Sequence, residues 1–242
     1  MKNKLIRTAS LLIAMVFLQA CESGLPESVY TTGVDYTDYK SDTKQLRFVK
    51  MHHIGKKEFY NNVSALVEKA KNENYVLYYE WIKFDLSTEI EKRKIRKLTG
   101  FIPSEEGYRE LISMIGDDSL VVQDNNQFLG LVNNKDYLVD ITHTELLDKF
   151  EQLHGKLILS EADLEAPIKE FLDVDISESK VNDVLLTERN KIIVEHITTH
   201  PHSKIIVLYG ANHEEGVIEL LKQENPSWYR VSKNIDTTKE NK

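Results

Sequence analysis

Apolar and polar residues follow one another along the first part of the chain in a pattern that predicts a crossover unit. Residues 46–51 alternate with the two-residue period of a strand, and residues 58–72 place their apolar side chains on one helical face. Residues 75–81 are aromatic and β-branched, which predicts a second strand. A strand, a helix and a strand in this order favour parallel pairing of the two strands.

The last third of the chain has an equally clear pattern. Residues 181–198 are largely helical in their apolar spacing, and residues 204–209 form a near-continuous apolar run. Such runs are typical of strands buried on both faces of a parallel sheet. Residues 214–223 predict a further helix and residues 228–231 a closing strand. The whole pattern predicts an α/β fold with a mixed, mostly parallel central sheet flanked by helices.

The middle of the chain, from about residue 86 to residue 173, has a weaker pattern, and no site is assigned to it. Helices are predicted at 89–98, 104–114, 142–153 and 160–172, and short extended segments at 117–131. The predicted helix at 104–114 begins with Ser-x-x-Gly, whereas a full capping box has Glu or Gln at the last of these positions.

The first twenty residues follow the pattern of a lipoprotein signal peptide. Three basic residues precede an apolar run at 11–18, which is too short to cross a bilayer. Ala20-Cys21 follows directly and resembles the lipobox read by lipoprotein signal peptidase. The alternative is an ordinary signal peptide or a buried first helix, but Cys21 is the only cysteine of the chain. We therefore expect cleavage before Cys21, diacylglycerol on its sulfur, an acylated amine and attachment to a lipid bilayer.

Cleavage would leave 222 residues (242 − 20), which suits one domain. The expected parts are the signal peptide at 1–20, the lipidated cysteine and a solvated tether at 21–44, the α/β domain at 45–232 and a polar tail at 233–242. The formal charge of −8 becomes −11 without the three basic residues (−8 − 3), and no basic cluster stands out. Nucleic acid is therefore not an expected partner.

The expected location is the extracytoplasmic side of the cell envelope. Glu22 follows the cysteine in place of the aspartate that often retains lipoproteins at the inner membrane. Where a cell has two membranes, this favours the outer one.

Three polar side chains stand at matching places in three predicted strands. His53 follows the first strand, Glu80 ends the second and His213 follows the last. The carboxyl ends of parallel strands meet at one edge, where ligands bind. Two imidazoles and one carboxylate make a common open site for a catalytic divalent metal. Arg189, early in the helix before the last strand, is expected over the same edge, where it would hold a carboxylate or carbonyl oxygen.

Each of these residues also has a plainer interpretation. His53 would cap the following helix or satisfy a polar group of the core, and Glu80 would pair with a nearby cation. His213 would simply open a helix, and Arg189 would be a surface partner of Glu188 or of another neighbouring acid. The other histidine pair of the last third, at 200 and 202, precedes the last buried strand and is expected at the opposite edge.

Four short stretches carry a resemblance to a known family. They are Met51-His52-His53-Ile54-Gly55, Tyr79-Glu80-Trp81, Glu188-Arg189-Asn190 and Gly210-Ala211-Asn212-His213. In these stretches, and in the order of elements over most of residues 45–232, the chain resembles the TraB/GumN family, which includes the pheromone-shutdown protein PrgY and the Tiki proteases. The resemblance implies two Gly-x-x-His motifs, a glutamate on the second strand and an arginine near the end. For the Tiki branch it implies a metal-dependent peptidase that uses manganese or cobalt.

The first of the two motifs departs from the family pattern, because Lys50 stands where the family has glycine. A glycine would let the backbone or a ligand approach closely, so Lys50 either changes the geometry of the site or supplies a cation to it. His53, rather than His52, is aligned with the family histidine because it directly precedes Ile54-Gly55. Adjacent residues of a strand face opposite ways, so only one of the two is expected to face the site.

These features together predict a membrane-anchored hydrolase that depends on a divalent metal and acts on extracytoplasmic peptides. His53, Glu80 and His213 would bind Mn, Co or Zn, or position a water that becomes a nucleophile. Glu80 is either a ligand or a general base, and Arg189 would orient a substrate carboxylate or stabilise oxyanion charge. The alternative is a non-catalytic lipoprotein that binds or sequesters a peptide, a signal molecule or a haem-like ligand.

Overall fold

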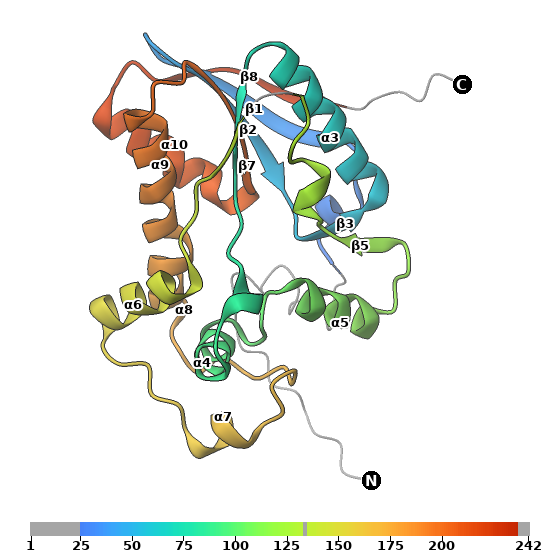
Figure 1. Ribbon diagram of the computed structural model, residues 1–242, viewed down its shortest axis with the longest axis vertical. Helices are drawn as coiled ribbons and strands as arrows, with labels where there is room; N and C mark the ends of the chain where they lie inside the picture. The colour runs from blue at the N-terminus through green and yellow to red at the C-terminus, as the bar shows by residue number, and fades with distance from the viewer. Residues whose placement is uncertain (1–24, 133–134, 237–242) are drawn as a thin grey trace.

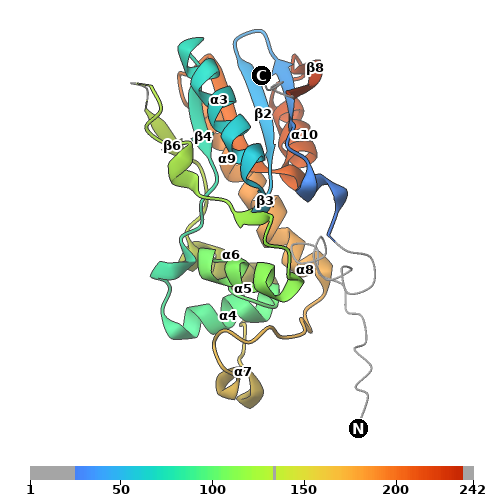
Figure 2. The same ribbon diagram turned by 90° about the vertical axis from the view of Figure 1, so that its right-hand side faces the viewer.

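The computed structural model describes residues 25–132 and 135–236 (Figures 1 and 2). The predicted signal peptide and Cys21 lie outside the described residues, as does the end of the predicted tail. Within these ranges, no helix is long and apolar enough to cross a membrane.

A six-stranded sheet in the order β6-β4-β7-β2-β1-β8 forms the centre of the fold. Its strands are β1 (Val34–Lys40), β2 (Gln45–Met51), β4 (Val76–Tyr79), β6 (Asp136–Leu138), β7 (Lys204–Gly210) and β8 (Tyr229–Asp236). The strands from β6 to β2 pair in parallel, whereas β1 is antiparallel to both β2 and β8. This confirms the predicted α/β fold with a mixed, mostly parallel sheet.

Helices cover both faces of the sheet, as Figure 1 shows. Helix α3 (Lys57–Asn72) packs on one face through the apolar stripe that its sequence predicts. Helices α9 (Arg189–Thr199) and α10 (Glu214–Glu224) pack on the other. Strand β7 lies between them, and its residues 205–209 are all buried, as expected for a strand covered on two faces.

A group of helices, here called the helical lobe, lies beyond one edge of the sheet, in the lower part of Figure 1. It contains the 3-10 turn η2 (Phe84–Leu86), α4 (Glu89–Thr99), α5 (Glu105–Ile115), α6 (His143–His154), α7 (Glu161–Glu165), α8 (Glu178–Asn182) and the π-helical turn η4 (Asp183–Glu188). Helices α4 and α6 begin with full capping boxes, and Ser104 caps α5 by accepting a hydrogen bond from Gly107 N–H.

Smaller elements join the sheet and the lobe. Strands β3 (Ile54–Lys56) and β5 (Leu120–Val122) form a two-stranded sheet, and the 3-10 turns are η1 (Glu27–Tyr30), η3 (Asn125–Gln127) and η5 (Ala211–His213). The predicted helix at 160–172 was wrong after Glu165, where α7 ends. Pro167 excludes the helical conformation for the residue before it, and Ala166 is extended, with ψ 136°.

The predicted tether is the largest correction to the expected layout of the chain. Residues 25–44 belong to the folded body: Val29 and Val34 are buried, and β1 is an inner strand of the sheet. The pattern was missed because Thr37 and Tyr39, rather than aliphatic residues, fill the buried face of β1. Residues 233–236 of the predicted polar tail likewise form the end of β8.

Candidate functional site

The register of the sheet brings the predicted site residues to one edge. Met51 of β2 pairs with Gly210 of β7, and Glu80 N–H donates to Leu208 O of the same strand at 3.1 Å. The chain therefore leaves β2, β4 and β7 at the same level. His53, Glu80 and His213 all emerge at this carboxyl edge, next to the helical lobe.

Glu80 is held at both of its carboxylate oxygens. Oε1 accepts a hydrogen bond from Arg189 Nη2 at 2.6 Å, and Oε2 accepts one from Gly210 N–H at 2.6 Å. A Cβ atom on residue 210 would lie 3.4 Å from Oε2, which is an ordinary contact distance, so the packing around Glu80 does not by itself require glycine at this position. Burial is the largest single influence and raises the pKa of Glu80, but the charge of Arg189, the two neighbouring histidines and the hydrogen bond from Arg189 together outweigh burial and lower this pKa to about 2.

Asp140 is a second buried carboxylate at this edge, and the sequence analysis missed it. It follows β6 by two residues, and its oxygens accept hydrogen bonds from Arg189 Nε at 2.9 Å and Nη2 at 2.8 Å. Burial raises the pKa of Asp140, and Arg189 opposes that shift. The available signal was an apolar run, Tyr137-Leu138-Val139, that ends in a carboxylate as the run before Glu80 does.

Arg189 uses all five of its N–H groups within the protein. Besides the carboxylates of Glu80 and Asp140, its guanidinium contacts Leu185 O at 3.3 Å and His213 Nε2 at 3.5 Å, both through Nη1. The π-helical turn η4 ends directly before Arg189 and contains Leu185, and such turns are frequent at functional sites. Because a guanidinium has five donors, Arg189 as placed has none left for a substrate carboxylate.

The plainer interpretation of Arg189 as a surface partner of Glu188 is wrong. The side chain of Arg189 is 5% exposed, and Glu188 pairs instead with Lys149 and Lys191. Arg189 is the centre of the buried network.

His213 is fixed in one tautomer by Asn190. The distance from His213 Nδ1 to Asn190 Oδ1 is 2.7 Å, and because an amide oxygen only accepts, Nδ1 carries the proton. Nε2 is then the unprotonated nitrogen and faces Arg189. Burial, followed by the charge of Arg189, lowers the pKa of His213 to about 3. Gly216 makes room for this contact, since a Cβ there would lie 2.3 Å from Asn190 Nδ2.

His53 and His52 face different surroundings, as their adjacency predicts. The His53 ring stacks on Tyr108 of α5, with ring centroids 5.0 Å apart, and burial lowers its pKa. In the described part of the chain no hydrogen bond reaches its imidazole. The His52 ring lies 5.3 Å from Phe59 of α3, and burial lowers its pKa to about 4.

Lys50, which departs from the family pattern, does not supply a cation to this edge. Its Nζ lies 3.0 Å from Asp35 Oδ2 and 3.2 Å from Glu214 Oε2. Lys50 therefore joins β2 to β1 and to the first turn of α10.

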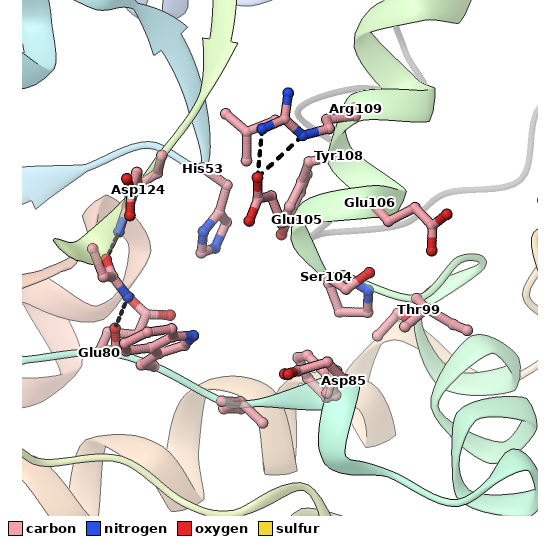
Figure 3. Close-up of a pocket in the computed structure, with 18 of the residues that line it drawn as sticks. His53, Glu80, Asp85, Thr99, Ser104, Glu105, Glu106, Tyr108, Arg109 and Asp124 are labelled. Atoms are coloured by element: carbon pink, nitrogen blue, oxygen red, sulfur yellow. Dashed lines mark hydrogen bonds and ion pairs between the residues drawn. The ribbon is translucent and has the colours of Figure 1, made fainter. Parts of the chain in front are cut away.

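A pocket of about 620 Å³ opens between the sheet edge and the helical lobe (Figure 3). His53, Glu80 and Arg189 line it from the sheet side, whereas His213 is not among its lining residues. The other walls include Trp81, Phe84, Ser104, Tyr108, Gln123 and Asn125. Asn125 Nδ2 donates to Glu80 O at 3.1 Å and so holds the loop after β5 against the sheet edge.

The donor set suits a divalent cation in its chemistry but not in its arrangement. Glu80 is ionised and both imidazoles are neutral, which are the states that ligation requires. However, the guanidinium of Arg189 contacts both Glu80 and His213, where an ion would have to lie. Among the described residues, no three His, Cys, Asp or Glu side chains are placed to share a metal ion.

The opposite edge of the sheet holds a second group of histidines, as the sequence predicts. The Tyr78 hydroxyl lies 2.9 Å from His200 Nδ1 and 3.5 Å from His202 Nδ1. The ring of His196 lies 4.9 Å from that of His200. No carboxylate side chain hydrogen-bonds these rings within the described ranges.

Comparison with known proteins identified no relative of this chain. No family model, curated protein or solved structure matches the chain.

Proposed function

We propose that this chain is a hydrolase of the cell envelope, anchored to a bilayer through Cys21, that cleaves peptides in the pocket lined by His53 and Glu80. The observation that carries this proposal is that a neutral imidazole and an ionised carboxylate line the same side of a pocket of about 620 Å³. The resemblance to the TraB/GumN family points in the same direction.

His53 is the proposed proton carrier. Burial lowers the pKa of its ring, so it is neutral near pH 7 and able to accept a proton from an attacking water. The same ring then returns the proton to the leaving amine. Glu80 stays ionised because Arg189 and Gly210 N–H hold it, and its charge favours the protonated form of His53.

A divalent ion, Mn, Co or Zn, is the proposed cofactor, and it would supply an activated water when bound. His53, Glu80 and His213 can act as its ligands only after Arg189 leaves Glu80 and His213, and with His53 as a ligand the metal-bound water would take over the role of the imidazole as proton carrier. Titration calorimetry with each metal measures this directly. Saturable binding by the wild-type chain that is lost in Glu80→Gln supports the cofactor, and heat signals that are equal in both chains contradict it.

Peptide hydrolysis tests the enzyme proposal. The full-length chain in detergent micelles is incubated with a mixed peptide library, with each of the three metals or a chelator, and cleavage is followed by mass spectrometry. We expect His53→Ala to lose about 10²–10⁴-fold in rate, because a positioned acid–base group contributes that much. Glu80→Gln should lose activity too. His52→Ala is the matched control and should retain it; unchanged cleavage by His53→Ala would contradict the proposal.

Binding without turnover is a second candidate, and one observation favours it. All five N–H groups of Arg189 and both oxygens of Glu80 already have partners, so the network is closed. The pocket would then hold a peptide, a signal molecule or a haem-like ligand. Tight peptide binding with no cleavage under any of the three metals would favour this candidate over the enzyme.

The anchor has its own test. Mass spectrometry of the N-terminal peptide should show Cys21 carrying acyl chains, and membrane fractionation should recover the chain with the bilayer. Cys21→Ser should release it. An unmodified cysteine at the mature N-terminus would contradict the anchor without bearing on hydrolysis.

A further inference from the structure

The proposed point of lipid attachment lies close in sequence to a residue that packs near the pocket wall. Leu25, the first described residue, is 8% exposed and belongs to the same apolar cluster as Ile54, Phe101 and Tyr108. Tyr108 lines the pocket and stacks on His53. The chain that enters the fold at Leu25 therefore packs against one wall of the pocket.

Only four bonds between residues separate Cys21 from Leu25. Even fully extended, such a stretch spans at most about 14 Å, at roughly 3.5 Å per residue. A tether of about 20 residues would instead let the body move some 25 Å from the bilayer. The burial of Leu25 therefore limits how far the pocket can lie from an anchored Cys21.

The helical lobe carries exposed apolar side chains of the kind that contact lipid. Among the described residues of this lobe and of the loop that joins its helices α6 and α7, six large aliphatic or thioether side chains are between 46% and 76% exposed: Leu86, Ile90, Met114, Leu153, Ile158 and Leu164. Leu86 and Ile90 lie close in sequence to Phe84, Asp85 and Lys92, which line the pocket. Large exposed apolar side chains on the part of the molecule nearest the proposed anchor are candidates for contact with lipid.

We infer that the helical lobe rests on the bilayer and holds the pocket at the membrane surface. The substrate of the pocket is then a peptide segment attached to the same membrane, rather than a freely diffusing peptide. This inference rests on the proposed lipid anchor and, for the substrate, on the proposed hydrolase. It follows from the short connection to Leu25 and the exposed apolar groups of the lobe.

Fluorescence quenching tests the orientation. Since Cys21 is the only native cysteine and is acylated, Ile90→Cys and Ile158→Cys each add one free thiol to the full-length chain. Val231→Cys on β8 is the matched control, at 57% exposure against 52% for Ile90. After labelling with an environment-sensitive dye, the chains are placed in phosphatidylcholine vesicles that contain brominated lipid. We expect several-fold stronger quenching at both lobe positions than at residue 231. Equal quenching at all three would overturn the orientation.

Lengthening the connection provides a second, independent test. A Gly/Ser insertion of about 20 residues between Ser23 and Gly24 should let the body leave the surface. Quenching at residue 90 should then fall toward the value at residue 231. Undiminished quenching would show that the lobe binds lipid without help from the short connection, and would overturn that part of the inference.

The substrate is tested with one peptide in two forms. One peptide of the library is presented either free or coupled to a phospholipid in the same vesicles. We expect faster cleavage of the lipid-coupled form, and an advantage that shrinks in the insertion variant. Equal rates would overturn the substrate class. If neither form is cleaved, the hydrolase proposal and the substrate class fail together, whereas the quenching pattern still decides the orientation.

Discussion

The two edges of the central sheet hold similar side chains but differ in charge. At the carboxyl edge, His213 lies in a closed network with Glu80, Asp140 and Arg189, whose side chains are between 0% and 10% exposed. At the opposite edge, the half-buried histidines at 200 and 202 surround the hydroxyl of Tyr78.

The difference teaches that buried carboxylates, rather than imidazoles, set the character of an edge. Buried carboxylates need a cation, and the guanidinium that satisfies them also fixes the neighbouring imidazole. The imidazoles of His200 and His202 at the opposite edge instead share the hydroxyl of Tyr78 as a partner. Substitutions at the carboxyl edge should therefore lower the free energy of unfolding more than substitutions at the opposite edge.

Removing Arg189 should have the largest effect. Arg189→Met leaves Glu80 and Asp140 buried without their partner, and we expect a loss of about 3–5 kcal/mol in the free energy of unfolding. Arg109→Met is the matched control, because its ion pair with Glu105 is largely exposed, and it should cost less than about 1 kcal/mol. Urea unfolding measures both. Equal losses in the two variants would remove the contrast between buried and exposed pairs.

The next largest difference between the two edges should appear in how the free energy of unfolding depends on pH. The folded-state pKa of His213 is lowered to about 3 from 6.5, so below pH 6.5 the unfolded chain takes up a proton that the folded chain refuses. The stability that His213 contributes is thus present above pH 6.5 and is lost as the pH falls toward 3. His213→Gln should make the unfolding free energy clearly less dependent on pH in this range.

His202→Gln is the comparison variant for the acid prediction. Burial also lowers the pKa of His202, but its ring is half-buried, so water screens the effect. We expect this variant to keep most of the pH dependence of the wild type. A larger change for His202→Gln than for His213→Gln would reverse the proposed ranking of the two edges.

A smaller effect is expected for substitution of Gly216, which leaves room for the Asn190 side chain that fixes the tautomer of His213. Gly216→Ala would place a Cβ 2.3 Å from Asn190 Nδ2 and displace that side chain. We expect a loss of about 1–3 kcal/mol, typical of overpacking, measured by urea unfolding. The imidazole ¹⁵N signals should also report loss of the fixed Nδ1–H form. Glu215→Ala, exposed on the same helix, should change stability by less than about 0.5 kcal/mol.

The smallest effect should come from the opposite edge. Tyr78→Phe removes the hydroxyl that lies 2.9 Å from His200 Nδ1, which should cost about 0.5–1.5 kcal/mol. Tyr229→Phe, 54% exposed on β8, is the control and should cost less than about 0.5 kcal/mol. A loss for Tyr78→Phe as large as that for Arg189→Met would mean that the two edges do not differ as described.

The sequence predicted which side chains reach the carboxyl edge better than it predicted the hydrogen bonds among them. Spacing relative to three strands was enough to bring Glu80, His213 and His53 to one edge, because parallel strands share a direction. It could not show that Asp140 joins them, since β6 has only three residues and lies in the weakly patterned middle of the chain. Nor could it show that Arg189 has no donor to spare, because hydrogen-bond saturation depends on the positions of five acceptors from separate parts of the chain.

The sequence by itself determined the α/β class, the parallel centre of the sheet and the separation of the two histidine groups, since these follow from local periodicity and strand direction. Only the tertiary structure decided where the folded body begins. Val34, Thr37 and Tyr39 look like parts of a polar linker until they are buried in the sheet, with Val34 under α3 and Tyr39 under α10. The tertiary structure also decided that Glu80 and His213 share a guanidinium. Burial and charge pairing are properties of neighbours in space, and the order of residues along the chain does not contain them.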